Sequence, residues 1–399
     1  MKLLAKSAIF VSLIAILISF VKFDHCRNFG WGAPQDYVHA CYSDLPALFS
    51  DRGLTTHTWP YSSATNAVEY PPVTGLVMWA TSFAVKHNFN QYRSYFDVNA
   101  ILIALLFIGT VLLLKRMKPE LWYLYPVAPA VVGSLFINWD MWAVISALGA
   151  IYLFDNGRYR NSAILLGLSI ATKFFPIVLL LPIAIIFWRQ GKKRELIKYS
   201  AITGFSWLVI NLPFIITTPT GWFRFFKLNS TRGADWGSIW HALSIFNLNI
   251  AHLNLYSTLL FLIGALAFAI FIFGIKEVPT LAQSSFFIVA IFVTASKVYS
   301  PQYILWLTPL AVIAMRDKKD RIAFWIWQFA ELIYHFAIWQ YLASYSGAHF
   351  GIPAKAYAAA VFIRVIALAY FTLALMRKST PEFDPQNREF LLSATEGYA

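Results

Sequence analysis

"DVNAILIALLFIGTVLLLKRMK", residues 97–118, is a long apolar run that ends in a basic cluster. An uncharged run of about 18 residues is long enough to cross a bilayer as a helix. Similar runs recur along the 399 residues, which are 59% hydrophobic and only 13% charged. The sequence therefore predicts an all-α polytopic membrane protein whose residues 1–399 form one domain.

Short basic clusters separate the apolar runs and predict the orientation of the chain. Under the positive-inside rule such clusters lie in the cytoplasm. The other clusters are at 157–160, 189–194, 316–321 and 376–378. Placing all of them inside gives about 12 crossings of the plasma membrane, with both termini and the tail 377–399 in the cytoplasm. The net charge of +13 is then explained by topology, and nucleic acid is not an expected partner.

One apolar piece, residues 70–86, is left over when the crossings are counted. It begins "EYPP" and contains Gly75, so we expect it to dip into the outer leaflet or to lie on it. Two long outer segments result, 24–96 and 216–254. Both mix aromatic residues with a few charges, which is typical of helices that lie in the membrane interface.

The N-terminal run is predicted to be a retained first span. It has a basic start but no clear small-x-small cleavage site, unlike a signal peptide. Both cysteines of the chain, Cys26 and Cys41, follow this span and therefore lie outside. A disulfide is allowed there, and two free thiols are the alternative.

The outer and near-outer face gathers carboxylates and cations that suit one reaction class. These residues are Asp44, Arg52, Glu69, Asp140, Lys173 and Lys297. Transfer of a group from a lipid phosphate to a hydroxyl needs a base for the hydroxyl proton and positive charge at the departing phosphate. The lipid tail of such a substrate explains why the chain is so apolar.

Structural roles are the alternative for these residues. Asp44 and Asp140 each stand where a helix N-cap is expected. Lys173 and Lys297 can reach the interface along their own stems, although intramembrane cations are functional by default. Both lysines stand in matching "A-[ST]-K…P" contexts, which weakens the purely structural interpretation.

The last two spans carry three further polar residues. We expect Glu331 and Arg364 to form a structural ion pair. His335 lies nearer the outer end of its span and is a candidate contact for a phosphate.

Several stretches, taken in order, resemble glycosyltransferase family 87, a branch of the GT-C superfamily. They are "CYSDLPALFSDRGL", "WPYSSATNAVEYPPVTG", "NWDMWAV", "ATKFFPIVLLLP" and "SKVYSPQYILWLTP". The resemblance covers residues 24–315 and is closest to actinobacterial α-mannosyltransferases that use polyprenyl-phosphate mannose. It implies a GT-C fold, an outward-facing active site, and inverting transfer of a mannosyl residue from the polyprenyl-phosphate sugar to a glycolipid or glycan.

The resemblance also implies roles for individual residues. The base of the family is an aspartate in the first outer loop, where Asp36 and Asp44 compete; the "CYSD" context favours Asp44. Tyr70 and Gln302, in "EYPP" and "SPQY", join the expected substrate-binding residues. Because the donor is a monophosphate, we expect neither a metal ion nor another cofactor.

Two other functional classes remain open at this point. The repeated Lys-Pro break at Lys173 and Lys297 resembles the paired broken helices of secondary transporters. A non-catalytic lipid-binding membrane protein is the third possibility. A transporter would not need an outer loop as long as 24–96, which favours the enzyme.

Overall fold

The fold is taken from a computed structural model that describes residues 2–63, 65–316 and 318–377. Within them the chain is all-helical and has no strand. Four described helices are long and apolar enough to cross a membrane by length and composition. They are α6 (Gln91–Met117), α12 (Lys193–Thr217), α15 (Leu253–Gly274) and α19 (Ala354–Arg377). The chain thus has the pattern of a polytopic membrane protein.

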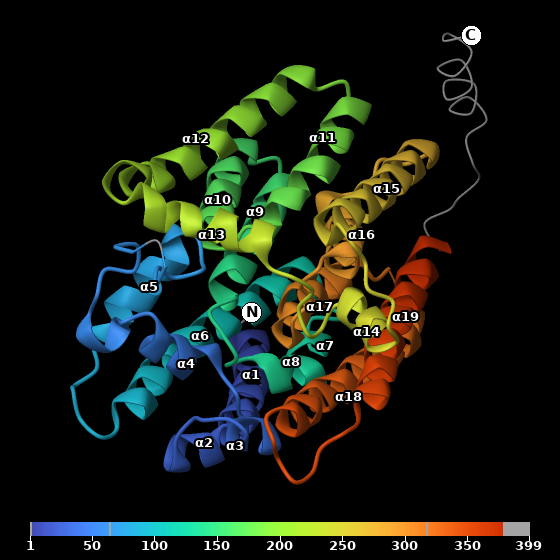
Figure 1. The fold of residues 1–399 in the computed structure, drawn as a ribbon. Helices are drawn as coiled ribbons and strands as arrows, with labels where there is room; N and C mark the ends of the chain where they lie inside the picture. Colours follow the sequence, from blue (N-terminus) through green and yellow to red (C-terminus); the bar gives the residue numbers. More distant parts are fainter. Residues whose placement is uncertain (1, 64, 317, 378–399) are drawn as a thin grey trace.

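Seven further described helices pack with these four (Figure 1). They are α1 (Lys2–Lys22), α9 (Met141–Asp155), α10 (Tyr159–Thr172), α11 (Leu180–Arg189), α16 (Leu281–Ala295), α17 (Ile304–Ala314) and α18 (Arg321–Tyr345). One continuous apolar core joins them and contains residues from Ala8 to Leu375. The expected cytoplasmic tail 377–399 lies, beyond Arg377, outside the described residues.

The apolar stretch at 121–137 is not one helix. The structure breaks it into α7 (Leu124–Val127) and α8 (Pro129–Ser134), with Ala128 extended between them. Proline explains the break, because the residue before a proline is disfavoured in the helical conformation and proline lacks the backbone donor. The turn that follows α8 carries residues 135–139 toward the first long loop segment.

The two lysine-proline turns have the same local form. After Lys173 the chain enters the 3-10 helix η2 (Phe175–Leu179), and after Lys297 it enters η3 (Pro301–Tyr303). In each case the preceding helix, α10 or α16, stops within two residues of the lysine. Each lysine therefore stands at a helix end instead of along a helix side.

The first long loop segment, 24–96, is folded into short helices. They are α2 (Asp24–Phe29), α3 (Gln35–Val38), α4 (Asp44–Asp51), η1 (Leu54–Thr56) and α5 (Pro72–Ser82). The 11 residues of α5 rise about 16 Å, roughly half the thickness of the hydrocarbon core of a bilayer. This length fits the expectation that 70–86 does not cross.

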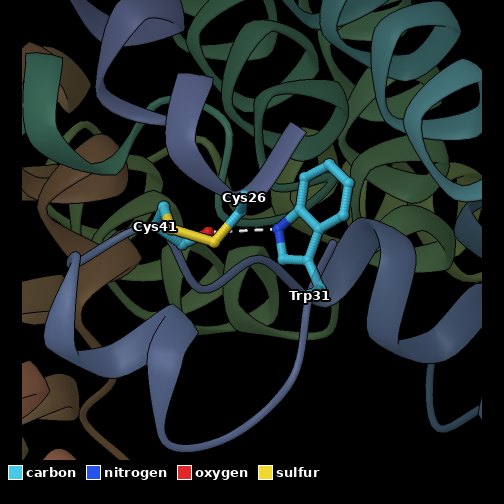
Figure 2. Close-up of a disulfide and its surroundings, with 3 residues drawn as sticks. All are labelled: Cys26, Trp31 and Cys41. Atoms are coloured by element: carbon cyan, nitrogen blue, oxygen red, sulfur yellow. Dashed lines mark hydrogen bonds between the residues drawn. A yellow bond between two sulfur atoms is a disulfide. The ribbon is translucent and has the colours of Figure 1, made fainter. Parts of the chain in front are cut away.

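A disulfide closes the start of this segment. Cys26 and Cys41 are both fully buried and are joined, and the Trp31 Nε1 donates a 3.1 Å hydrogen bond to the carbonyl of Cys41 (Figure 2). The loop between them contains α3. The disulfide therefore fixes α3 beside the residues that lead into α4.

The second long segment, 216–254, also contains helices. α13 (Pro219–Thr231) and α14 (Ile239–Ile245) follow α12, and residues 232–238 connect them. The backbone N–H of Asp235 donates a 2.8 Å hydrogen bond to the carbonyl of Lys297. This bond holds the connection against the turn between α16 and η3. The remaining 3-10 helix is η4 (Lys318–Asp320), which precedes α18.

Candidate active site

A cavity of about 760 Å³ lies where the two long loop segments meet the two lysine-proline turns. Its lining comes mainly from 37–70, 173–175, 225–258, 292–306 and 338–342. The charged lining residues are Asp44, Glu69, Lys173, Arg232, Asp235 and Lys297. Groups that are more than 250 positions apart in the chain are thus brought to one space.

Asp44 is held in this cavity by the start of α4. Ser43 is the N-cap, and its hydroxyl accepts a 3.2 Å hydrogen bond from the Leu45 N–H while donating a 2.8 Å bond to the Phe136 carbonyl. The Asp44 N–H donates to the Ile137 carbonyl at 2.8 Å. The side chain of Ser43 makes the cap, so the carboxylate of Asp44 is left for another role.

Two phenols donate to the carboxylate of Asp44. The Tyr42 hydroxyl lies 3.0 Å from Oδ1, and the Tyr70 hydroxyl lies 3.3 Å from Oδ2. The charge of Asp44 and burial hold the pKa of Tyr42 well above its usual value, so the phenol stays protonated as a donor. Burial raises the pKa of Asp44 to about 6, against the opposing effects of the Tyr42 hydrogen bond and the Lys173 charge. A carboxylate with such a pKa is still ionised at neutral pH and is a better base than an ordinary one.

The other carboxylate at this end, Glu69, is neutralised by Arg52. The Arg52 Nε and Nη2 both donate to Oε2 of Glu69, at 2.8 Å and 2.5 Å. Glu69 lines the cavity, but Arg52 does not. Arg52 therefore positions Glu69, and a direct contact of Arg52 with a substrate stays a prediction.

Lys173 is paired in a similar way. Its Nζ donates to Oδ1 of Asp140, and the Trp306 Nε1 donates to Oδ2 of the same residue at 2.8 Å. The ammonium also lies 4.7 Å from the centroid of the Tyr70 ring. Asp140 is buried behind the cavity wall and makes no side-chain cap for α9, so its role is to compensate Lys173.

Lys297 stands at the opposite end, next to Arg232. The Lys297 Nζ donates to the Arg232 carbonyl at 2.8 Å and to the Asn254 Oδ1. The Arg232 Nη2 donates to Oδ2 of Asp235 at 2.9 Å. Lys297 is therefore bonded to the backbone of Arg232, whose guanidinium is paired with Asp235, and both cations line the cavity.

Two of the six charged lining groups have no ion-pair partner among the described residues. Glu69, Lys173, Arg232 and Asp235 are each in an ion pair. Asp44 has only its two phenols, and Lys297 has only neutral oxygens. An unpaired carboxylate and an unpaired ammonium thus share one cavity, which is the charge arrangement that base-assisted displacement of a phosphate needs.

The remaining expected residues divide between the lining and its surroundings. Tyr70 and Gln302 line the cavity. His335 does not, since its Nδ1 lies 3.3 Å from the Ser134 hydroxyl and its Nε2 accepts a 3.3 Å hydrogen bond from the Trp339 Nε1. His335 supports Trp339, which does line the cavity, and its contact with a phosphate stays a prediction.

Asp36 and the Glu331–Arg364 pair also lie outside the lining. Asp36 is buried in α3 and is not a lining residue, which favours Asp44 over it as the base. Arg364 is fully buried, with Nε 3.4 Å from Oε2 of Glu331. This pair has the structural role that the sequence suggested.

The sequence did not single out Arg232, Asp235 and Asn254. All three are in the polar run "NSTRGADWGS" and the stretch after it, within the second long segment. An excess of charge in that otherwise aromatic segment is the one signal that marks them.

Comparisons with known proteins leave the family open. No family model matches the sequence, so membership of glycosyltransferase family 87 stays a prediction. No curated protein matches it. A solved structure that the chain is similar to is that of ArnT from Cupriavidus metallidurans bound to undecaprenyl phosphate, with a TM-score of 0.46 and 14% identity over 92% of this chain and 76% of that chain. The function is therefore inferred from the residues of this chain.

Proposed function

We propose that the protein is an integral-membrane glycosyltransferase that moves a mannosyl residue from a polyprenyl-phosphate sugar to a hydroxyl of a glycolipid or glycan. The observation that carries the proposal is the unpaired carboxylate of Asp44 in one cavity with the unpaired ammonium of Lys297. The choice of mannose and of a polyprenyl donor comes from the resemblance to glycosyltransferase family 87. The extracytoplasmic position of the site comes from the distribution of basic clusters.

In the proposed reaction Asp44 takes the proton of the acceptor hydroxyl. The acceptor oxygen then forms a bond to the anomeric carbon of the donor, from the face opposite the phosphate. The bond between that carbon and the phosphate oxygen breaks, and its electron pair leaves with the polyprenyl phosphate. Configuration at the anomeric carbon is inverted.

The departing phosphate would be met by the basic end of the cavity. Lys297 lines the cavity without an ion-pair partner among the described residues, while Arg232 and Lys173 are lining cations compensated by Asp235 and Asp140. Positive groups fixed in a space with little water stabilise developing negative charge more strongly than they would in water. Phe225, Phe226 and Phe292 line the cavity as well and offer an apolar surface to the first isoprene units.

The test is mannosyl transfer by the purified full chain in nanodiscs. Labelled polyprenyl-phosphate mannose is supplied with a membrane lipid extract, and the labelled product is identified. Asp44→Asn should lower the rate by about 10²–10⁴-fold, the usual effect of losing a general base. Asp51→Asn is the matched control, because Asp51 is exposed at the other end of α4.

Three outcomes would reject the proposal. Full transfer by the Asp44→Asn protein would show that Asp44 is not the base. Uptake of a solute into proteoliposomes without any covalent product would instead identify a transporter, and retention of donor lipid without turnover would identify a lipid-binding protein.

A further inference from the structure

Three aromatic rings form a continuous part of the cavity wall beside Asp44. They belong to Tyr37 in α3, Tyr42 just before α4, and Trp339 in α18, and all three are lining residues. The Tyr37 and Trp339 rings are 6.2 Å apart and nearly parallel, at 9°. Tyr42 lies 5.5 Å from each of the other two ring centroids. We call this set the aromatic wall.

The aromatic wall is held rigidly from behind. His335 accepts the Trp339 indole N–H, and the Gln340 side chain donates a 3.3 Å hydrogen bond to the Val38 carbonyl, which ties α18 to α3. The Cys26–Cys41 disulfide closes the loop that carries Tyr37. Rings fixed in this way present the same surface to each ligand, and little conformational freedom is lost when one binds.

The wall is chemically different from the rest of the cavity. The basic end at Lys297 suits a phosphate, and the phenylalanine surface suits a hydrocarbon chain, because it offers no polar group. The aromatic wall combines flat π faces with the Tyr42 hydroxyl and the Asp44 carboxylate at its edge. A pyranose ring has the matching surface: polarised C–H groups on one face, which pack on the negative face of an aromatic ring, and hydroxyls around the rim.

We propose that the aromatic wall is the subsite for the acceptor, and that the reacting acceptor hydroxyl belongs to a sugar ring packed on the half-buried ring of Tyr37, which the buried Trp339 supports from behind. This inference rests on the proposed function, in which Asp44 takes the proton of that hydroxyl. It goes further because it names the acceptor as a glycosyl unit and excludes a hydroxyl on an open lipid chain. The donor sugar then lies between the wall and the basic end.

The test measures binding in the absence of donor, so that it does not depend on turnover. The full chain in nanodiscs is titrated with hexyl α-mannopyranoside and with 1-O-hexylglycerol, which carries the same alkyl chain without a sugar. The wild-type protein should bind the mannoside more tightly. Tyr37→Leu should weaken that binding roughly 3- to 10-fold, the range expected for one aromatic stacking contact, and leave the hexylglycerol Kd unchanged.

Further variants distinguish the loss of a ring contact with the sugar from misfolding of the variant protein. Trp339→Leu should abolish the preference for the mannoside, and Trp339→Phe should restore most of it. Tyr37→Leu is the variant that should fold more readily, because Tyr37 is half-buried on a short loop helix while Trp339 is buried in α18. Phe329→Leu is the control on α18, because Phe329 is 56% exposed and does not line the cavity.

Each result decides the matter. Equal Kd values for the two probes in wild-type protein, or an unchanged mannoside Kd in both Tyr37→Leu and Trp339→Leu, would overturn the inference. If the proteins do turn over, a rise in the KM of the donor instead of the acceptor would also overturn it. A wild-type protein that binds the mannoside at the wall but transfers no sugar would refute the proposed function and leave the sugar subsite standing.

Discussion

Replacing Tyr42 by phenylalanine isolates the effect of one hydrogen bond on the proposed base. The Tyr42 hydroxyl donates to Asp44 Oδ1 at 3.0 Å, and the substitution removes that donor but keeps the ring of the aromatic wall. A phenol that donates to a carboxylate stabilises the charged form. Its loss should therefore raise the pKa of Asp44 above its value of about 6.

The size of the shift follows from the geometry. A hydrogen bond to a charged group contributes about 1.5–3 kcal/mol, and one pKa unit corresponds to about 1.4 kcal/mol. Asp44 is only partly buried and keeps the Tyr70 donor at 3.3 Å, so we take the lower limit, about one unit. Asp44 acts as a base only when it is deprotonated, so activity is lost as the pH falls through its pKa. At pH 6 the variant should have roughly one fifth of the wild-type kcat/KM, and above about pH 8.5 the two should agree.

The assay is the pH profile of kcat/KM for labelled polyprenyl-phosphate mannose, from about pH 5 to 9. Tyr92→Phe provides the same chemical change on a part-exposed tyrosine away from Asp44 and should leave the profile unchanged. Tyr70→Phe, which removes the longer hydrogen bond, should shift it less. Two results would show that Asp44 is not the base. One is a Tyr42→Phe pH profile that coincides with that of the wild type. The other is an Asp44→Asn protein whose residual activity still falls at low pH as the wild-type activity does.

Three further substitutions test the packing around the cavity. Cys41→Ser opens a disulfide with a sequence separation of 15 and should lower the stability of the fold by about 3 kcal/mol, read from unfolding in denaturant; an unchanged midpoint would contradict this. Gly237→Ala would place a methyl group against the Tyr299 carbonyl and the Tyr334 hydroxyl. The connection that holds Lys297 would be displaced, so the rate of transfer should fall on the order of tenfold or more. Gly233→Ala is the control and should leave the rate unchanged, because its methyl group meets open space. Arg364→Met leaves the buried Glu331 carboxylate without its cation and should lower the free energy of unfolding by about 3–5 kcal/mol. The double variant, which also carries Glu331→Met, should recover most of that loss. Equal losses in the single and double variants would contradict an ion pair.

Much of the fold follows from the sequence because bilayer-length apolar runs constrain the backbone strongly. The apolar run at 97–118 forms most of α6 (Gln91–Met117), as expected for a stretch long enough to cross a bilayer. The break at Ala128 does not show in the apolar composition of 121–137, because it depends on the effect of Pro129 on the backbone of the residue before it. The backbone preference of a residue before proline therefore outweighs the apolar composition of this stretch.

The sequence predicted part of the cavity lining but not which charged residues pair. Asp44, Glu69, Lys173 and Lys297 were all expected on one face, and all line the cavity. Which cation neutralises which carboxylate depends on contacts between segments far apart in the chain, such as Lys173 with Asp140. No single sequence carries that information, since the pairing arises only from tertiary packing.

The same is true of the residues that were missed. Arg232 stands in a long segment without helical periodicity, where nothing local distinguishes a ligand-binding guanidinium from a solvated one. Its importance appears only when the backbone of 232–238 is seen bonded to the turn at Lys297.

The spread of the cavity lining along the chain has a consequence for biosynthesis. Asp44 is made early, whereas Ile338, Trp339 and Leu342, which complete the lining of the same cavity, are made late. At about 5–20 residues per second, a ribosome needs roughly 15 to 60 seconds to travel from one to the other. A nascent chain therefore holds Asp44 without a complete cavity until α18 has been synthesised, and under the proposed function fragments released before that point should transfer no sugar.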